Sequence, residues 1–237
     1  MANRVWADLM GRGIVEPVDD FRATNPPTNR PLMNALGQHF AESGFSLTEL
    51  VRVIANSHVY QLSSLPNERN VADTQNYSRH YRHRLRAEVL LDAFAHISGI
   101  PQKFDAMPPG TNARQIWTHR TTSLFLDTFG RPDPNQDPPC ERTTDSTVVQ
   151  SLHLMNSENL HRDLTNKDGN AAKLAESKKD PAELAHHLYH LIYSRNPTTE
   201  ETQLIADLLT AENADRKQVI EDLMWAMLNS PEFVIQD

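Results

Sequence analysis

The stretch that decides the fold is DPAELAHHLYHLIYSRNPTTEETQLIADLLTAENADRKQVIEDLMWAML, residues 180–228. Its apolar residues recur every three or four positions, which predicts three amphipathic helices. Asp180 and Pro181 are typical of a helix start, and Thr198 with Glu201 has the capping-box spacing that would begin the next helix. Because short connections favour antiparallel neighbours, we expect a helical bundle here.

The rest of the chain shows the same periodicity. Further amphipathic patterns occupy residues 3–10, 31–43, 46–54 and 85–98. Long proline-rich loops, which we expect to be ordered, separate them. Residues 121–129 are rich in Thr and Phe and could form at most a minor strand or extended segment. The expected fold class is therefore all-α, with a single irregular multi-helix domain over residues 1–237.

Within that domain the composition suggests three regions. We expect N-terminal helices in residues 1–100, a loop region in residues 101–145 and the C-terminal helical bundle in residues 146–237. The loop region holds several prolines and Cys140, the only cysteine. A nucleophilic cysteine needs a histidine close in space, and the sequence does not show whether His119, His153 or another histidine approaches Cys140, so a structural thiol is favoured.

The charge and cysteine content exclude several partners. The formal net charge is −8, and nucleic acids and anionic membranes bind basic surfaces, so we expect no nucleic acid partner. No apolar run approaches the ~18–20 residues of a membrane span, and the N-terminus lacks a signal-peptide pattern, so no membrane insertion is expected. A single cysteine cannot provide the CxxCH pair that attaches c-type haem, so we expect no cofactor in this chain.

A helix is expected to begin near Ser146. Helical spacing places a set of apolar residues and two asparagines on one broad face of it, namely Val148, Val149, Leu152, Met155, Asn156, Asn159 and Leu160. The amides would then point inward. They could hold the backbone of a neighbouring loop, or they could form the floor of a ligand pocket.

Two arginines and the polar side of this helix define a candidate ligand site. Guanidinium groups can clamp carboxylate, sulfate or phosphate, although in an acidic chain they can equally pair with its own acids. The candidate ligand-binding residues are Arg84, Arg142, Gln150, His153 and Asn156. They would suit an anionic or carbohydrate ligand.

His186 and His190 are one helical turn apart, a spacing that allows two imidazoles to share a zinc or copper ion. His187 adds a third nitrogen nearby. The pattern lacks the glutamate of HExxH and has no evident third ligand, so solvent-facing histidines are the alternative interpretation.

An ordered set of motifs resembles a known family. The motifs are NRVW at 3–6, GRGIVEPVDDF at 11–21, SHVYQLSS at 57–64, RLRAEVLLDAF at 84–94, FLDTFGRPD at 125–133, CER at 140–142, QSLHLMNS at 150–157 and LMWAMLNSPEF at 223–233. Together they resemble the C-terminal domain of unknown function of large planctomycete-type proteins that also carry cytochrome-c-like domains. The resemblance covers nearly the whole chain.

The resemblance implies a context more than a reaction. It implies an extracytoplasmic setting, in the periplasm or at the cell surface, and haem only on a partner domain. Many members have a Cys-x-Cys pair in the proline loop, where Pro138 replaces the first cysteine in this chain. The resemblance therefore does not carry a disulfide or a two-thiolate metal site over to this chain.

Three functional hypotheses follow. The first is a non-catalytic interaction or structural module that packs against a cytochrome-like or other domain of the same protein, with the proline loop and the basic cluster at 79–86 as contact surfaces. The second is an enzyme or binding domain for an anionic or carbohydrate ligand. The third is a metal site at His186 and His190.

Overall fold

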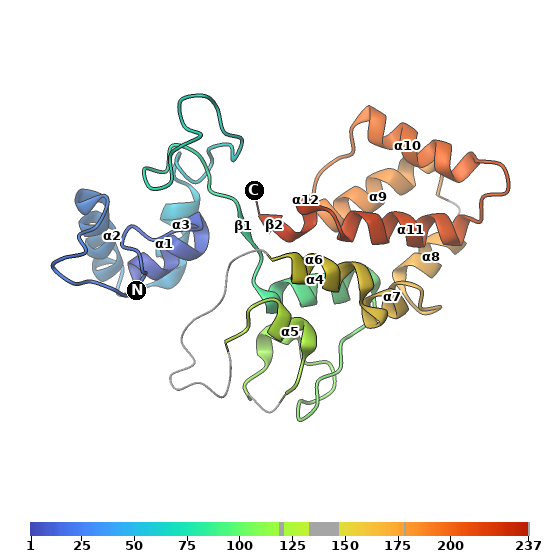
Figure 1. Ribbon diagram of the computed structural model, residues 1–237, viewed down its shortest axis with the longest axis horizontal. Helices are drawn as coiled ribbons and strands as arrows, with labels where there is room; N and C mark the ends of the chain where they lie inside the picture. Colours follow the sequence, from blue (N-terminus) through green and yellow to red (C-terminus); the bar gives the residue numbers. More distant parts are fainter. Residues whose placement is uncertain (119–120, 133–146, 178, 237) are drawn as a thin grey trace. The chain divides into compact units, whose positions relative to one another are not determined.

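The computed structural model describes residues 1–118, 121–132, 147–177 and 179–236. In this described part of the chain there are twelve α-helices, one short 3-10 helix and two strands of two residues each (Figure 1). The all-α class is confirmed. The chain divides into two compact units, residues 1–83 and residues 84–236, which are described separately.

Three helices form the first unit: α1 (Ala2–Met10), α2 (Arg30–Glu42) and α3 (Leu47–Ala55). They pack on one another through a core of eight buried residues, Ala2, Trp6, Met10, Ile14, Leu36, Leu50, Ile54 and Tyr77. The rings of Trp6 and Tyr77 meet edge to face with their centroids 5.2 Å apart. Tyr77 thereby fixes the long loop that follows α3 against α1.

The loop after α1 is fixed by one buried asparagine. The Asn3 side-chain nitrogen donates to the carbonyl oxygens of Val15 at 2.9 Å and Val18 at 2.7 Å, while the Val15 amide donates to the Asn3 oxygen at 3.1 Å. Gly13 is required inside this loop, because a Cβ there would lie 2.3 Å from the Val15 carbonyl oxygen. The GRGIVEPVDDF motif is thus an ordered turn held by the first helix.

The second unit contains the other helices, and it begins at Arg84, the second residue of β1 (His83–Arg84), which pairs with β2 (Ile235–Gln236). Its helices are α4 (Ala87–Ser98), η1 (Ala113–Gln115), α5 (Leu124–Thr128), α6 (Val148–Asn156), α7 (Glu158–Leu164), α8 (Asn170–Glu176), α9 (Pro181–Tyr193), α10 (Thr199–Thr210), α11 (Arg216–Leu228) and α12 (Pro231–Val234). The three helices predicted from residues 180–228 are α9, α10 and α11 (Figure 1). The capping box at Thr198 and Glu201 is also confirmed.

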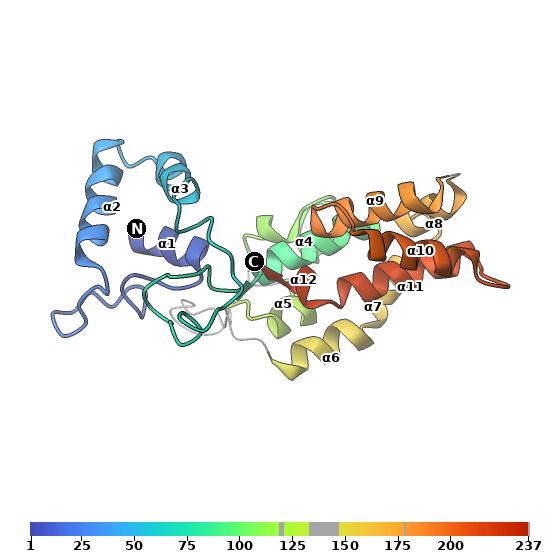
Figure 2. The same ribbon diagram turned by 90° about the horizontal axis from the view of Figure 1, so that it is seen from above.

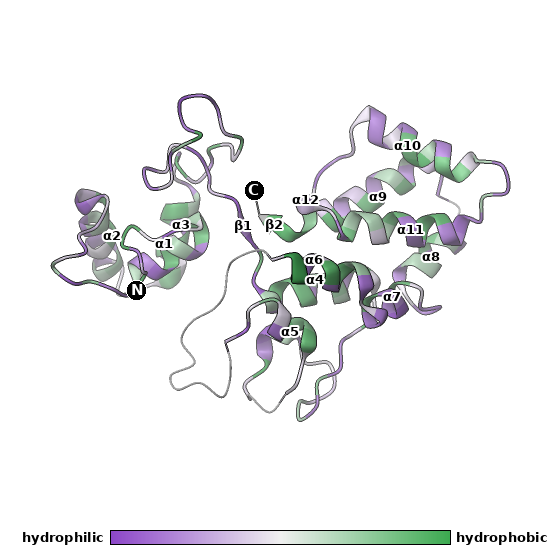
Figure 3. Cartoon of the chain, viewed as in Figure 1, coloured by the Kyte–Doolittle hydropathy of each residue, from purple (hydrophilic) through white to green (hydrophobic). Residues whose placement is uncertain are grey.

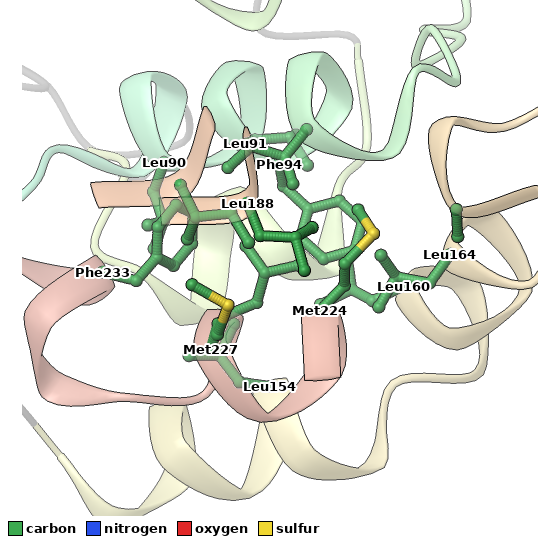
Figure 4. Close-up of a cluster of buried hydrophobic side chains, with 14 of the residues drawn as sticks. Leu90, Leu91, Phe94, Leu154, Leu160, Leu164, Leu188, Met224, Met227 and Phe233 are labelled. Carbon is green, nitrogen blue, oxygen red and sulfur yellow. The ribbon is translucent and has the colours of Figure 1, made fainter. Parts of the chain in front are cut away.

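One core holds this unit together. Figure 4 labels side chains that converge on it from helices far apart in the sequence: Leu90, Leu91 and Phe94 from α4, Leu154 from α6, Leu160 and Leu164 from α7, Leu188 from α9, Met224 and Met227 from α11, and Phe233 from α12. Because α4 buries its apolar stripe in this C-terminal core, the compact units divide at His83 and Arg84. From the sequence, we placed the end of the N-terminal helical region at residue 100, whereas the compact units divide after residue 83.

Within residues 121–129, where at most a minor strand or extended segment was expected, Leu124–Thr128 form helix α5. The Ser123 hydroxyl accepts a hydrogen bond from the Leu126 amide at 3.3 Å and caps the helix. Phe125 and Phe129, one turn apart, stack with centroids 4.4 Å apart inside the core. Packing of this apolar face overrides the strand preference of Thr and Phe.

The helix expected from Ser146 onward is two helices, and its orientation was predicted wrongly. Ser157 ends α6 and caps α7 by accepting from the Leu160 amide at 3.5 Å. On α6 the buried residues are Gln150 and Leu154, at 4% and 8% exposure. Four of the apolar residues predicted to face inward are 52–75% exposed: Val148, Val149, Leu152 and Met155. The fifth, Leu160 on α7, is buried as predicted, at 5% exposure. Burial of α6 against α5 decides this orientation, because Gln150 reaches the Thr128 carbonyl.

None of the described helices has both the length and the apolar composition that a membrane crossing requires.

Candidate functional site

The four described residues of the predicted ligand site line two different pockets. Arg84 and Gln150 line a small pocket of about 160 Å³ beside Phe129. His153 and Asn156 line a different pocket of about 490 Å³. Arg142, like Cys140 and the proline loop around it, lies outside the described residues.

Arg84 is buried and bonds to the backbone of its own unit. Its Nη2 donates to the Phe129 carbonyl at 2.8 Å and its Nη1 to the Leu85 carbonyl at 3.1 Å. The guanidinium carbon lies 5.4 Å from the centroid of the Phe129 ring. Burial lowers the pKa of Arg84 from its ordinary value. These contacts give Arg84 a structural role in joining β1 to the end of α5.

The nitrogen and the oxygen of the Gln150 side-chain amide both form hydrogen bonds within the second unit. Its nitrogen donates to the Thr128 carbonyl at 3.1 Å, and its oxygen accepts from the Thr147 amide at 3.2 Å. The Thr147 hydroxyl accepts from the Gln150 amide in return, which completes a capping box at the start of α6. The Thr-x-x-Gln spacing in the sequence is the local pattern that could have predicted this capping box.

His153 is half-buried beside the stacked rings of Phe125 and Phe129. Its ring centroid lies 5.7 Å from that of Phe125 and 6.0 Å from that of Phe129, both in edge-on arrangements. Burial lowers the pKa of His153 and favours the neutral imidazole. Asn156 is exposed and its nitrogen donates to the Leu152 carbonyl at 3.0 Å within the same helix. The prediction that Asn156 turns into the unit is therefore wrong.

The two candidate metal ligands, His186 and His190, are both exposed on α9. The Nε2 atom of His190 lies 2.8 Å from the side-chain oxygen of Asn196. Among the residues that the structure describes, no group of three His, Cys, Asp or Glu side chains could hold a metal ion. The described part of α9 thus supplies an imidazole pair and no third ligand.

The part of the basic cluster that precedes β1 contacts the first unit, to which it belongs. The Arg79 guanidinium lies 5.2 Å from the centroid of the Tyr81 ring, and the Arg82 Nε donates to the Ser64 hydroxyl at 3.1 Å. His80 is buried with its ring edge-on to Tyr60. These contacts order the chain before β1.

A polar cluster around Arg195 was not predicted from the sequence. The guanidinium makes paired hydrogen bonds to Glu201 at 2.8 and 2.9 Å and to Glu232 at 2.5 and 3.0 Å, and it lies 4.9 Å from the Tyr189 ring centroid. The bonds from Arg195 lower the pKa of Glu201 to about 2. Because Glu232 lies 37 positions from Arg195, the sequence carries no local signal for this pair.

The apolar face of α6 that was predicted to be buried is exposed. Val148, Leu152 and Met155 follow one another at helical spacing on the exposed side, with Val149 beside them. Figure 3 shows α6 as a strongly hydrophobic helix, and in Figure 2 it lies at the outside of its unit. We call these four residues the outer face of α6.

A family described as "Protein of unknown function (DUF1553)" matches residues 1–209, which is most of the chain. The chain belongs to this DUF1553 family. Neither the curated proteins nor the solved structures contain a match to it. The matched residues end within α10, yet α11 and α12 contribute Met224, Met227 and Phe233 to the core shared with the matched helices. The core of this DUF1553 chain thus extends beyond the matched residues.

Proposed function

We propose that this DUF1553 chain is a non-catalytic interaction module that binds another protein domain through the outer face of α6. The supporting observation is the exposure of Val148, Val149, Leu152 and Met155, each of which is at least half exposed. Contiguous apolar surface on a folded protein marks interaction sites, since exposing it to water is unfavourable. Helical spacing on this face suits packing against another helix or a groove.

The internal bonding of the polar candidates supports the same proposal. Arg84 and Gln150 bond to the backbone of their own unit, and Asn156 bonds to its own helix. A catalytic or ligand-binding role would need such groups to be directed toward a substrate. Their present role is to hold β1, α5 and α6 in place.

We further propose that the partner is a cytochrome-like or other domain of the same protein, in an extracytoplasmic setting, as the family resemblance implies. In that arrangement haem would belong to the partner domain. This chain would supply the docking surface.

Photocrosslinking tests the proposal. Benzoylphenylalanine is introduced at Leu152 in the full-length protein in its native cells, and at Lys173, an exposed residue of α8, as the matched control. We expect Leu152 to crosslink to one defined region of another domain and Lys173 to give no such product. Equal labelling from both positions, or none from Leu152, would refute a docking role for α6.

A second candidate function rests on the pocket of about 490 Å³. His153 and Asn156 line it together with Gln102, Lys103 and Glu158. Because most of the other lining groups are amides, hydroxyls and apolar side chains, the pocket suits a neutral polyhydroxyl ligand better than an anion. A titration with neutral oligosaccharides tests it, with an Asn156→Ala variant as comparison. Binding that this variant leaves unchanged would contradict a role for the pocket.

A further inference from the structure

A hollow of about 730 Å³ adjoins the outer face of α6. Residues from the junction of α6 and α7 and from α7 itself form one wall, among them Met155, Glu158 and His161. The other wall is one face of α11, where the lining residues recur with helical spacing at Gln218, Glu221, Asp222 and Trp225. Met155 belongs both to this hollow and to the outer face of α6, so the two surfaces are continuous.

The hollow is acidic. Glu158, Glu221 and Asp222 line it, whereas none of the described residues that line it is a lysine or arginine. Lys217, just outside, lies 3.2 Å from a carboxylate oxygen of Glu221 and offsets that one charge. Within the described chain Glu158 and Asp222 form no ion pair. The remaining charge therefore excludes an anionic ligand and favours a cation.

Trp225 and Met155 add an aromatic ring and a thioether to the lining of the hollow. Trp225 is partly exposed in the hollow, and an indole face attracts ammonium and guanidinium groups. The Met155 side chain adds a polarizable apolar contact for the aliphatic stem of a long cationic side chain. The apolar surface can contact the aliphatic stem of a lysine or arginine side chain, and the carboxylates can bind its charged end group.

We propose that the hollow receives a lysine or arginine side chain of the protein segment that docks on α6. This inference rests on the proposed function and specifies the chemistry of the partner. The partner segment would carry an apolar stripe for Val148, Leu152 and Met155, followed by a basic residue that reaches Trp225, Asp222 and Glu158. Charge complementarity would then fix the direction in which the segment lies along α6.

A small-molecule titration tests the hollow separately from α6. The probes are N-acetyl-arginine amide and its neutral isostere N-acetyl-citrulline amide, added up to about 50 mM because a single side chain binds weakly. The indole N–H signal of Trp225 is followed by NMR. We expect arginine amide to shift this signal and citrulline amide to leave it in place. Asp222→Asn should weaken the response about fivefold, and Leu152→Ser should not change it.

The outcomes distinguish the cation site in the hollow from docking on the outer face of α6. Equal shifts with both probes, or no shift with arginine amide, would overturn the cation site and leave docking on α6 intact. Failure of crosslinking from Leu152 with a normal arginine response would refute docking on α6 and, with it, the partner segment, leaving only a site for a free cation.

Discussion

Arg84 donates a hydrogen bond to the carbonyl of Phe129, 45 residues along the chain, and its guanidinium also lies over the ring of the same residue. The bond joins β1, at the start of the second unit, to the end of α5. Arg84 is therefore better explained as part of the fold than as a ligand-binding group.

Replacing Arg84 should accordingly reduce stability. Arg84→Gln removes a buried charge-assisted hydrogen bond and the contact with the Phe129 ring, and we expect a loss of about 2–3 kcal/mol in the free energy of unfolding. Urea denaturation measures it. Arg162→Gln, at an exposed position on α7, is the control and should change stability by less than about 0.5 kcal/mol. A value below about 0.5 kcal/mol for Arg84→Gln would show that the bond contributes little.

The Arg195 cluster predicts a pH dependence. Arg195 lowers the pKa of Glu201 from 4.5 to about 2, so the ion pair stabilises the fold above pH 4.5 and this contribution is lost as the pH falls toward 2. Because the Arg195 side chain is 36% exposed, solvent screening limits the effect to about 1 kcal/mol. Glu201→Gln keeps a capping-box acceptor and should lose this amount at pH 7 but little near pH 2. Glu212→Gln, exposed after α10, should show no such pH dependence.

The buried Asn3 predicts a local effect in the first unit. Asn3→Ala would leave the Val15 and Val18 carbonyls and the Val15 amide without their partner, at a cost of about 2–3 kcal/mol. Hydrogen exchange should then accelerate in residues 11–21. Exchange in α9 serves as the internal reference, because that helix belongs to the other compact unit. Unchanged exchange in residues 11–21 would contradict the role assigned to Asn3.

Two leucines of α6 test which side of the helix is buried. Leu152 is exposed and Leu154 lies in the core. Leu154→Ala should reduce the free energy of unfolding by about 2–4 kcal/mol, because it leaves a cavity, whereas Leu152→Ala should cost less than about 1 kcal/mol. Thermal and urea denaturation of the two variants gives the comparison. The reverse ranking would restore the orientation predicted from the sequence.

The elements that could be predicted from the sequence are those with strong local signals. α9 and α10 begin at Asp180 and Thr198 because side-chain caps satisfy exposed amides, and such caps are visible as short motifs. Five-residue α5 was missed because its helical pattern is too short to outweigh the strand preference of Thr and Phe.

The orientation of α6 could not be predicted, for a different reason. Periodicity identifies an apolar face but assumes that this face is turned to the chain's own core. On α6 the face with Gln150 and Leu154 is buried instead, through bonds to Thr128 and contact with α5. The contact of Arg84 could not be predicted either, because its partner Phe129 lies 45 residues away along the chain.

The position of α11 also has a practical consequence. Its Ile220, Met224 and Leu228 are fully or almost fully buried against helices that precede residue 209, where the family match ends. A recombinant fragment cut at the end of the match would leave the apolar faces of α8 and α9 uncovered, and such a product would be prone to proteolysis and aggregation. Expression and deletion work on relatives of this protein should therefore keep the chain through the residues that correspond to α12.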